Sequence, residues 1–171
     1  DIYVPMLKKA NITLDLKNNE DNTLVKKLIS KADVLIEGFR PGVMERLGLG
    51  PTDCEKINPK IIFGRITGWG QNGPYAKKAG HDINYLSITG ALNAIGLKHT
   101  GPIPPLNLLG DYAGGTMFLI MGILSALWER NSSNKGQVID AAMIEGVPAL
   151  MSLIHTFISE KNWNNSRSSN L

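Results

Sequence analysis

The stretches Ala32-Asp-Val-Leu-Ile-Glu37 and Lys60-Ile-Ile-Phe-Gly-Arg-Ile66 decide the fold of this 171-residue chain. Short apolar runs of this kind are typical of strands that are buried on both faces of a parallel sheet. Between them, Pro41 suits the first turn of a helix over 43–47, and Thr52 is the expected N-cap of a second helix. The segment therefore predicts two strands joined through helices.

The flanking segments continue this alternation. Residues 11–16 alternate between polar and apolar side chains, which predicts a strand, and an amphipathic helix follows over 24–31. Further on, residues 117–128 and 141–159 predict mostly apolar helices, with a short strand over 137–140 between them. We therefore expect an α/β fold of Rossmann-like type, in which a parallel sheet has flanking helices. The first strand lacks a following Gly-x-Gly-x-x-Gly fingerprint, which argues against a nicotinamide or flavin dinucleotide.

Composition is that of an ordinary globular domain, with 43% hydrophobic and 19% charged residues. The net charge of +3 comes without a polybasic run, so we expect no nucleic-acid or membrane partner. The apolar run 117–128 is too short to cross a bilayer. Cys54 is the only cysteine, which excludes an internal disulfide and a cysteine metal site and fits a reducing compartment.

An acidic residue, Asp111, stands between glycines in Asn107-Leu-Leu-Gly-Asp-Tyr-Ala-Gly-Gly115, at the mouth of an apolar helix. One interpretation is a helix cap that accepts hydrogen bonds from first-turn amides. The other is a catalytic carboxylate, with glycines that let a ligand approach the backbone closely. These residues alone leave both interpretations open.

Two further stretches have the residue types of a ligand site. The loop Thr67-Gly-Trp-Gly-Gln-Asn-Gly-Pro74 follows a predicted strand, where α/β proteins bind ligands, although it also fits a long turn. His81 opens a predicted helix in Gly80-His-Asp-Ile-Asn-Tyr85. It fits either a surface capping residue or a group that transfers protons near neutral pH.

Taken together, these stretches resemble the family III CoA-transferase superfamily, and its α-methylacyl-CoA racemase branch in particular. The resemblance is carried by 32–50, 67–74, 80–85, 107–115 and Lys135-Gly-Gln-Val-Ile-Asp-Ala-Ala-Met143. It extends from about Leu14 to the end. It implies that residues 1–171 are a single CoA-binding fragment of the large domain, without the first strand and the small domain of the family.

The resemblance implies an isomerase that inverts the α-carbon of 2-methylacyl-CoA thioesters. His81 and Asp111 are the implied catalytic bases of a two-base proton transfer through an enolate, and we expect backbone amides from Asp111 onwards to bind the enolate oxygen. The implied CoA contacts are Leu14, Asp15, Leu16, Lys17, Gly38, Phe39, Arg40, Arg46, Gly80, His81, Asp82, Ile83, Asn84 and Tyr85. No metal is implied, and no cofactor beyond the CoA that the substrate carries.

Two alternatives remain beside the racemase. In CoA-transferases of this superfamily the residue that matches Asp111 is a nucleophile, and such an enzyme has no need for His81 as a second base. The chain could also be an inactive CoA-binding fragment. The resemblance further implies an acyl-CoA substrate, an interlocked homodimer at full length, and a role in fatty acid and lipid metabolism. The implied location is intracellular: peroxisome or mitochondrion in a eukaryote, cytoplasm in a bacterium.

Overall fold

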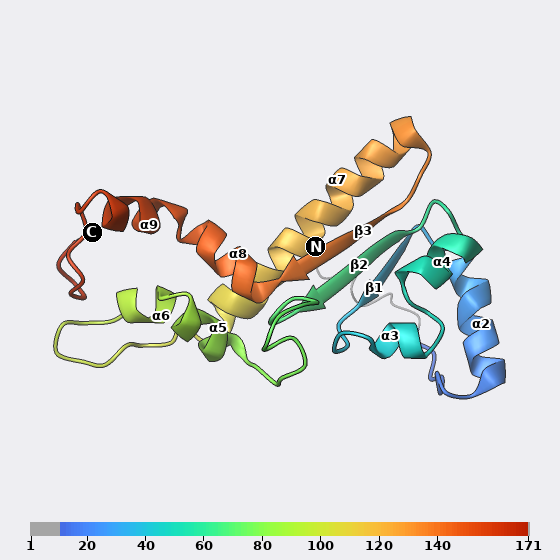
Figure 1. Cartoon of the computed structure of the whole chain (residues 1–171), viewed down its shortest axis with the longest axis horizontal. Helices are drawn as coiled ribbons and strands as arrows, with labels where there is room; N and C mark the ends of the chain where they lie inside the picture. The colour runs from blue at the N-terminus through green and yellow to red at the C-terminus, as the bar shows by residue number, and fades with distance from the viewer. Residues whose placement is uncertain (1–10, 171) are drawn as a thin grey trace.

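The computed structural model describes residues 11–170, which form a parallel sheet with helices on both faces and a helical arm beyond one end of it (Figure 1). Residues 1–10 and 171, which the single-fragment interpretation includes, lie outside the described part. The elements in chain order are α2 (Asn19–Ile29), β1 (Val34–Glu37), α3 (Val43–Arg46), α4 (Pro51–Ile57), β2 (Ile62–Thr67), α5 (Asp82–Ile88), α6 (Ala91–Ala94), the π-helix η1 (Leu108–Thr116), α7 (Met117–Ser133), β3 (Gln137–Ala142), α8 (Met143–Leu150) and α9 (Ser152–Ser159).

The sheet has the strand order β1-β2-β3, and both strand pairs are parallel. In the register of the central strand, Arg65 lies between Glu37 on β1 and Asp140 on β3. The predicted α/β class with a parallel sheet is therefore confirmed. All three carboxyl ends lie at the same edge of the sheet, next to the arm.

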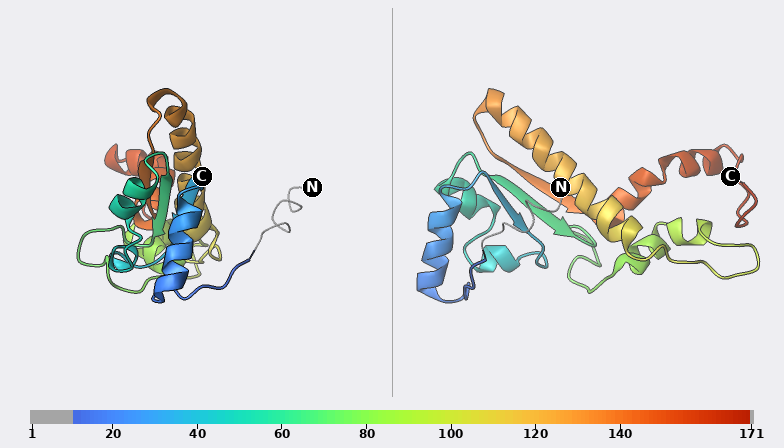
Figure 2. Two further views of the ribbon diagram at one scale, coloured as in Figure 1. Left: turned by 90° about the vertical axis from the view of Figure 1, so that its right-hand side faces the viewer. Right: turned by 180° about the vertical axis from the view of Figure 1, so that it is seen from behind.

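The two faces of β2 are buried against different helices. Phe63 packs into a cluster with Ile29 of α2 and Cys54 of α4, whereas its neighbour Ile62 packs against α7. Figure 2 shows α2 and α4 on one side of the sheet and α7 on the other. Burial on both faces explains why this strand is apolar without alternation. Gly64 lets α7 come close, because a Cβ there would lie 3.0 Å from Cδ1 of Ile123.

The predicted strand over 11–16 is wrong, because this segment is irregular. Its backbone groups bond to side chains of the following helix and not to a neighbouring strand. The amide of Asp15 donates to Asp21, and the carbonyl of Leu16 accepts from Asn22. The alternating pattern was present, but no strand of the described chain pairs with it.

Helix boundaries also depart from the predicted ones. The cap of α4 is Gly50 and not Thr52, and the Asp53 carboxylate accepts from the Gly50 amide at 3.2 Å. The predicted helix over 141–159 is divided at Met151, three residues after Pro148, where α8 ends and α9 begins.

The η1 and α7 segments join into one helix over 108–133, which contains an 18-residue stretch with a mean hydropathy of 1.4 and by length and composition could cross a membrane. The run that the sequence marked, 117–128, is only part of it. A single helix of this kind is weak evidence for a membrane span, because core helices of soluble proteins have the same length and composition. Here Leu119, Ile123 and Ala126 pack against the sheet.

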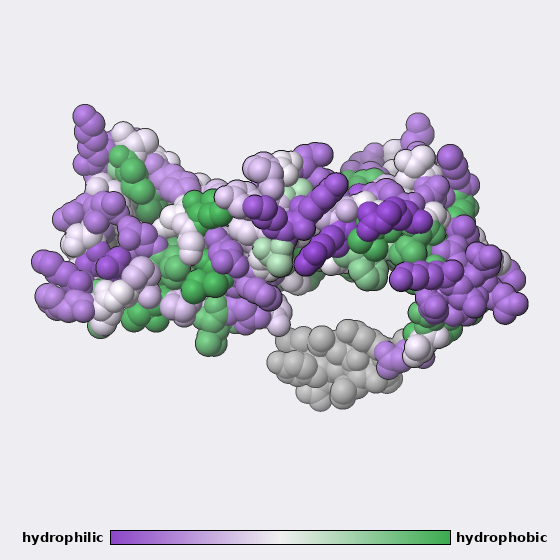
Figure 3. All heavy atoms as spheres, turned by 60° about the horizontal axis from the view of Figure 1, so that its bottom comes forward, coloured by the Kyte–Doolittle hydropathy of each residue, from purple (hydrophilic) through white to green (hydrophobic). Residues whose placement is uncertain are grey.

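The arm consists of α5, α6, α8 and α9. Its core is a small cluster of Leu86, Ala91, Val147 and Met151, and α9 has no buried residue. Figure 3 shows hydrophobic atoms at the surface of this part of the molecule. The exposed apolar side chains of the four arm helices include Ile83, Ile88, Leu150, Leu153 and Ile158.

Candidate active site

A cleft of about 450 Å³ lies at the carboxyl ends of the strands. Each strand supplies residues that directly follow it: 38–41 after β1, 68–69 after β2 and Met143 after β3. Sites of this kind are the usual ligand position in open parallel sheets. The lining residues are Gly38, Phe39, Arg40, Pro41, Ile66, Thr67, Gly68, Trp69, Ala76, Lys78, Ala79, Gly80, His81, Tyr85 and Met143.

The cleft brings together two of the segments that the sequence associated with CoA. Residues 38–40 lie on one wall, and Gly80, His81 and Tyr85 lie on another. Arg40 is exposed, so its guanidinium is accessible to an anionic ligand. The structure therefore places a candidate catalytic base beside a candidate phosphate contact, although 40 residues separate them in the chain.

Other predicted CoA residues lie outside this cleft. Residues 14–17 precede α2, where Leu16 packs against the cluster around Phe63. Arg46 is exposed on α3 and does not line the cleft. Its guanidinium lies close to Gly42, since a Cβ on Gly42 would be 3.3 Å from Nη1. The structure does not bring these residues together with His81.

His81 is the N-cap of α5, as its place in the sequence predicted. Asn84 fixes the backbone at this point, because its side chain accepts from the His81 amide at 2.9 Å and its own amide donates to the His81 carbonyl at 2.8 Å. The imidazole makes no hydrogen bond to a residue within 11–170. The ring is exposed at the cleft and open to a ligand.

Asp82 ties the helix that starts after His81 to the π-helix that contains Asp111. Its Oδ2 accepts hydrogen bonds from the amides of Gly110 at 2.6 Å and Asp111 at 2.9 Å. Its side chain is buried, and a Cβ on Gly110 would lie only 2.8 Å from this oxygen. The capping role that the sequence left open for Asp111 therefore belongs to Asp82. Asp111 is half-buried and does not line the cleft, and its carboxylate accepts no hydrogen bond from a described residue.

The amide of Asp111, the first of the expected enolate donors, already donates to Asp82. Two other amides, those of Asp82 and Ile83 in the first turn of α5, donate to no residue that the structure describes. They directly follow His81 in the chain. Unlike the amide of Asp111, these two amides have no acceptor within 11–170, but Asp82 is buried and neither residue lines the cleft.

Tyr85 and Trp69 form an aromatic floor. Their ring centroids are 4.7 Å apart in an edge-to-face arrangement, and Tyr75 packs on Trp69 at 5.1 Å. Burial raises the pKa of Tyr85, and the negative charges of Asp111 and Asp82 raise it further. The phenol is therefore neutral at physiological pH, and the charge of Asp111 reaches the floor of the cleft.

Trp69, Lys78 and Met143 are among the lining residues that sequence reasoning did not assign to the site. The aromatic residue in the glycine-rich loop was noticed but not assigned a role, and Met143 was interpreted as core. Lys78 lies in a stretch with no pattern of its own, and its ammonium packs over the Tyr75 ring at 5.3 Å. Its only signal in the sequence is its position four residues after the glycine-rich loop over 67–74.

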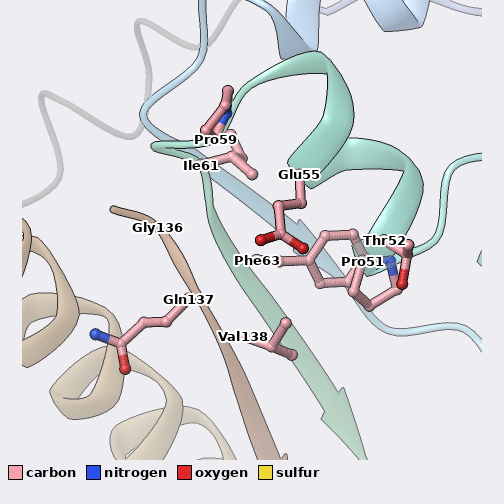
Figure 4. A pocket seen from close by; sticks show the side chains of 9 residues that line it. All are labelled: Pro51, Thr52, Glu55, Pro59, Ile61, Phe63, Gly136, Gln137 and Val138. Carbon is pink, nitrogen blue, oxygen red and sulfur yellow. The ribbon is translucent and has the colours of Figure 1, made fainter. Parts of the chain in front are cut away.

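A second cleft of about 200 Å³ lies between the start of α4 and strands β2 and β3 (Figure 4). Its walls are formed by Pro51, Ile61, Phe63 and Val138 among others, and Glu55 is the only ionisable residue that lines it. It contains no predicted site residue. Within 11–170, no three His, Cys, Asp or Glu side chains are grouped so that they could hold a metal ion.

Known proteins are similar to this chain over most of its length. The profile of CoA-transferase family III matches residues 7–170. The chain is 45% identical to the alpha-methylacyl-CoA racemase of Mus musculus over 95% of its own length and 43% of the relative's length. It is 38% identical to the acetyl-CoA:oxalate CoA-transferase of Acetobacter aceti, over 84% of this chain and 37% of that protein.

A solved structure shows the same fold. A CaiB/BaiF family protein from Brucella suis superimposes with a TM-score of 0.83 at 30% identity, over 91% of this chain and 41% of that chain. The chain thus spans less than half of the length of these relatives. The profile match covers nearly all of the sequence, and the chain belongs to CoA-transferase family III.

Proposed function

We propose that the protein is an α-methylacyl-CoA racemase, which inverts the α-carbon of 2-methylacyl-CoA thioesters with His81 and Asp111 as its two bases. The observation that carries the proposal is the double hydrogen bond of Asp82 to the amides of Gly110 and Asp111. Because Asp82 directly follows His81, these hydrogen bonds hold the backbone beside His81 against the backbone of Asp111. The similarity to a racemase at 45% identity supports the same chemistry.

The proposed reaction needs only groups that this chain contains. In one direction the neutral His81 imidazole takes the α-proton, and the electron pair of the C–H bond moves toward the thioester carbonyl to form an enolate. Asp111, in its acid form, then returns a proton to the opposite face of the carbon. In the other direction the two residues exchange roles. The result is inversion without a change in oxidation state.

The enolate oxygen needs hydrogen-bond donors that are already in place. The first-turn amides of Asp82 and Ile83 are unoccupied and directly follow His81, so we assign this role to them. Phe39 and Arg40 are assigned to the CoA moiety, because a guanidinium suits phosphate oxygens. The segment 14–17 and Arg46 remain proposed CoA contacts on the resemblance alone.

The test is NMR of a 2-methylacyl-CoA with the purified protein in heavy water. Deuterium at the α-carbon with inversion, and with no acceptor acid present, is the expected result. CoA transfer to an added carboxylate without exchange would instead indicate a CoA-transferase with Asp111 as nucleophile, an alternative that the 38% identical oxalate transferase supports. Binding of CoA without either reaction would identify an inactive CoA-binding fragment.

Two variants test the roles of the bases. His81→Ala should reduce α-proton exchange from one enantiomer by on the order of 10²–10⁴-fold and leave the Kd for CoA nearly unchanged. Asp111→Asn should do the same for the other enantiomer. His99→Ala is the matched control, because His99 is exposed and does not line the cleft. Unchanged exchange of both enantiomers in His81→Ala would give His81 a structural role only.

A further inference from the structure

Arg65 is a buried cation in the middle of the apolar central strand. Its side chain is 7% exposed, and its neighbours Phe63 and Ile62 are core residues. An arginine is rarely buried unless it is paired, because removing a charge from water costs several kcal/mol. Apolar residues of similar volume often stabilise a core as well or better. Stability alone therefore does not account for a cation at this position.

The partners of Arg65 suggest what it does. Its Nε donates to Oε1 of Glu37 at 3.0 Å, and its Nη1 donates to Oε1 of Glu45, also at 3.0 Å. Glu37 is the last residue of β1, and Glu45 belongs to α3. These are the elements on the two sides of the loop over 38–42, which we call the 38–42 loop. One guanidinium thus holds both ends of this loop.

Glu37 passes this constraint on to the loop itself. Its second oxygen, Oε2, accepts a hydrogen bond from the amide of Phe39 at 2.7 Å. The Glu37 side chain is only 3% exposed, so no solvent competes for either oxygen. Because the guanidinium fork is rigid, Arg65 sets the orientation of the Glu37 carboxylate, and the carboxylate in turn sets the Phe39 amide.

The charges agree with a fixed arrangement. Burial acts to raise the pKa of Glu45, but the hydrogen bond and charge of Arg65 outweigh it, and the pKa lies below its ordinary value. Burial acts to lower the pKa of Arg65, and the two carboxylates more than compensate, so that it lies above its ordinary value. Arg65 and Glu45 are therefore both charged at neutral pH.

We propose that Arg65 is a positioning residue that holds the 38–42 loop in its CoA-binding shape through Glu37 and Glu45. Arg65 does not line the cleft, whereas Gly38, Phe39 and Arg40 do. The inference rests on the proposed function, since it takes CoA as the ligand of this loop. Arg65 thereby determines the affinity for CoA without touching it.

The test compares Arg65→Lys with Arg130→Lys. A lysine keeps the charge but presents a single point of contact and not a planar fork. Arg130 is the matched control, because it also pairs with a carboxylate, Asp33 at 2.9 Å, and with two carbonyls, but does not line the cleft. Both variants lose an arginine network, and only one of the networks reaches the 38–42 loop.

We expect Arg65→Lys to raise the Kd for free CoA and the KM for the acyl-CoA by about tenfold, with kcat changed by less than about twofold. Arg130→Lys should leave Kd and KM unchanged. The amide resonance of Phe39 in an NMR spectrum without ligand should move in Arg65→Lys only. Glu37→Gln, which keeps the shape of the side chain, should raise Kd in the same direction if Arg65→Lys fails to fold.

Three results would overturn the inference: an unchanged Kd in Arg65→Lys, an equal change in Arg130→Lys, or a loss confined to kcat. If the unaltered protein binds no CoA, the proposed function fails. The Phe39 resonance then still decides whether Arg65 controls the loop, because that measurement needs no ligand.

Discussion

The sheet half of the molecule, defined by α2 to β2 together with α7 and β3, differs from the arm in how it is stabilised. The sheet half has a core cluster on each face, with Phe63 on one side and Ile62 on the other. The arm has one small cluster, and its last helix buries nothing. The candidate CoA loop is in the sheet half, whereas His81 is the N-cap of α5 in the arm and Asp111 belongs to η1, which contacts α5 and α8. The proposed binding and proton transfer therefore depend on regions of unequal stability.

The largest expected effect is in the sheet half. Phe63→Ala should lower the free energy of unfolding by about 3–5 kcal/mol, because the ring is 1% exposed and its removal leaves a cavity. Chemical denaturation followed by circular dichroism measures it. Phe63→Leu, which keeps most of the volume, should lose much less. An equally small loss in both variants would show that the sheet half is not the stable part.

A substitution in the arm should act locally. A Cβ on Gly146 would overlap the carbonyl oxygen of Gly114 and lie 2.9 Å from its Cα, so Gly146→Ala pushes α8 away from η1. We expect a cost of about 1–3 kcal/mol in the α8–η1 contact. Amide hydrogen exchange should become faster in α5, α8 and α9 and stay unchanged in β2. The proposed racemase activity should fall with it.

Gly101→Ala is the control for this variant, since no atom lies within 4 Å of the added Cβ. Faster exchange in β2 as well would show that the two regions unfold as one cooperative unit. In that case the difference in core size would have no consequence for local opening.

The smallest expected effect is on the pH dependence of the free energy of unfolding, and it comes from Cys54, which is fully buried in the sheet half. Burial raises the pKa of its thiol from 9.0 to about 11, and the charge of Asp53 contributes. As the pH rises from 9 to 11, the unfolded chain loses this proton before the folded one does. The thiol therefore stabilises the fold below pH 9, and this contribution is lost toward pH 11.

Urea denaturation at pH 8 and pH 10.5 measures this contribution. The fall in stability between the two should be smaller in Cys54→Ala, in which the other titrating groups are unchanged. An equal fall in both proteins would mean that the thiol does not titrate with unfolding, and that the cluster around it opens more easily than its burial indicates.

The sequence predicted the parallel sheet and the edge at which the cleft lies, because buried strands and the glycines after them leave local patterns. It failed over 11–16, where the pattern of a strand is present without a partner. Whether a segment pairs as a strand depends on the rest of the sheet, so six residues alone do not predict it. The side chains of Asp21 and Asn22 bond to the backbone of this segment instead.

The candidate site was predicted in its residues but not in its connections. His81 and Asp111 were proposed from the resemblance, and their roles stay predictions. The hydrogen bonds of Asp82 to the π-helix join residues that are 28 and 29 positions apart in the chain, so no local pattern indicates them. Arg65 did leave a signal, since a charge inside Ile-Ile-Phe-Gly-Arg-Ile is out of place in a buried strand. Its partners, Glu37 and Glu45, could be found only from the strand register and the position of α3.

The π-helix gives the segment around Asp111 an unusual sensitivity to chain length. A π-helix fits more residues into each turn than an α-helix, and each α-helical residue advances the direction of the side chain by about 100°. Deleting one residue between Leu108 and Thr116 would allow the segment to return to the α-helical form. Because the wider turn takes up one extra residue, its loss would leave the flanking turns nearly in place and redirect the side chains within η1 itself. A length change of one residue, with no change of chemistry, would thus turn the Asp111 carboxylate while α7 keeps the face that it presents to the sheet.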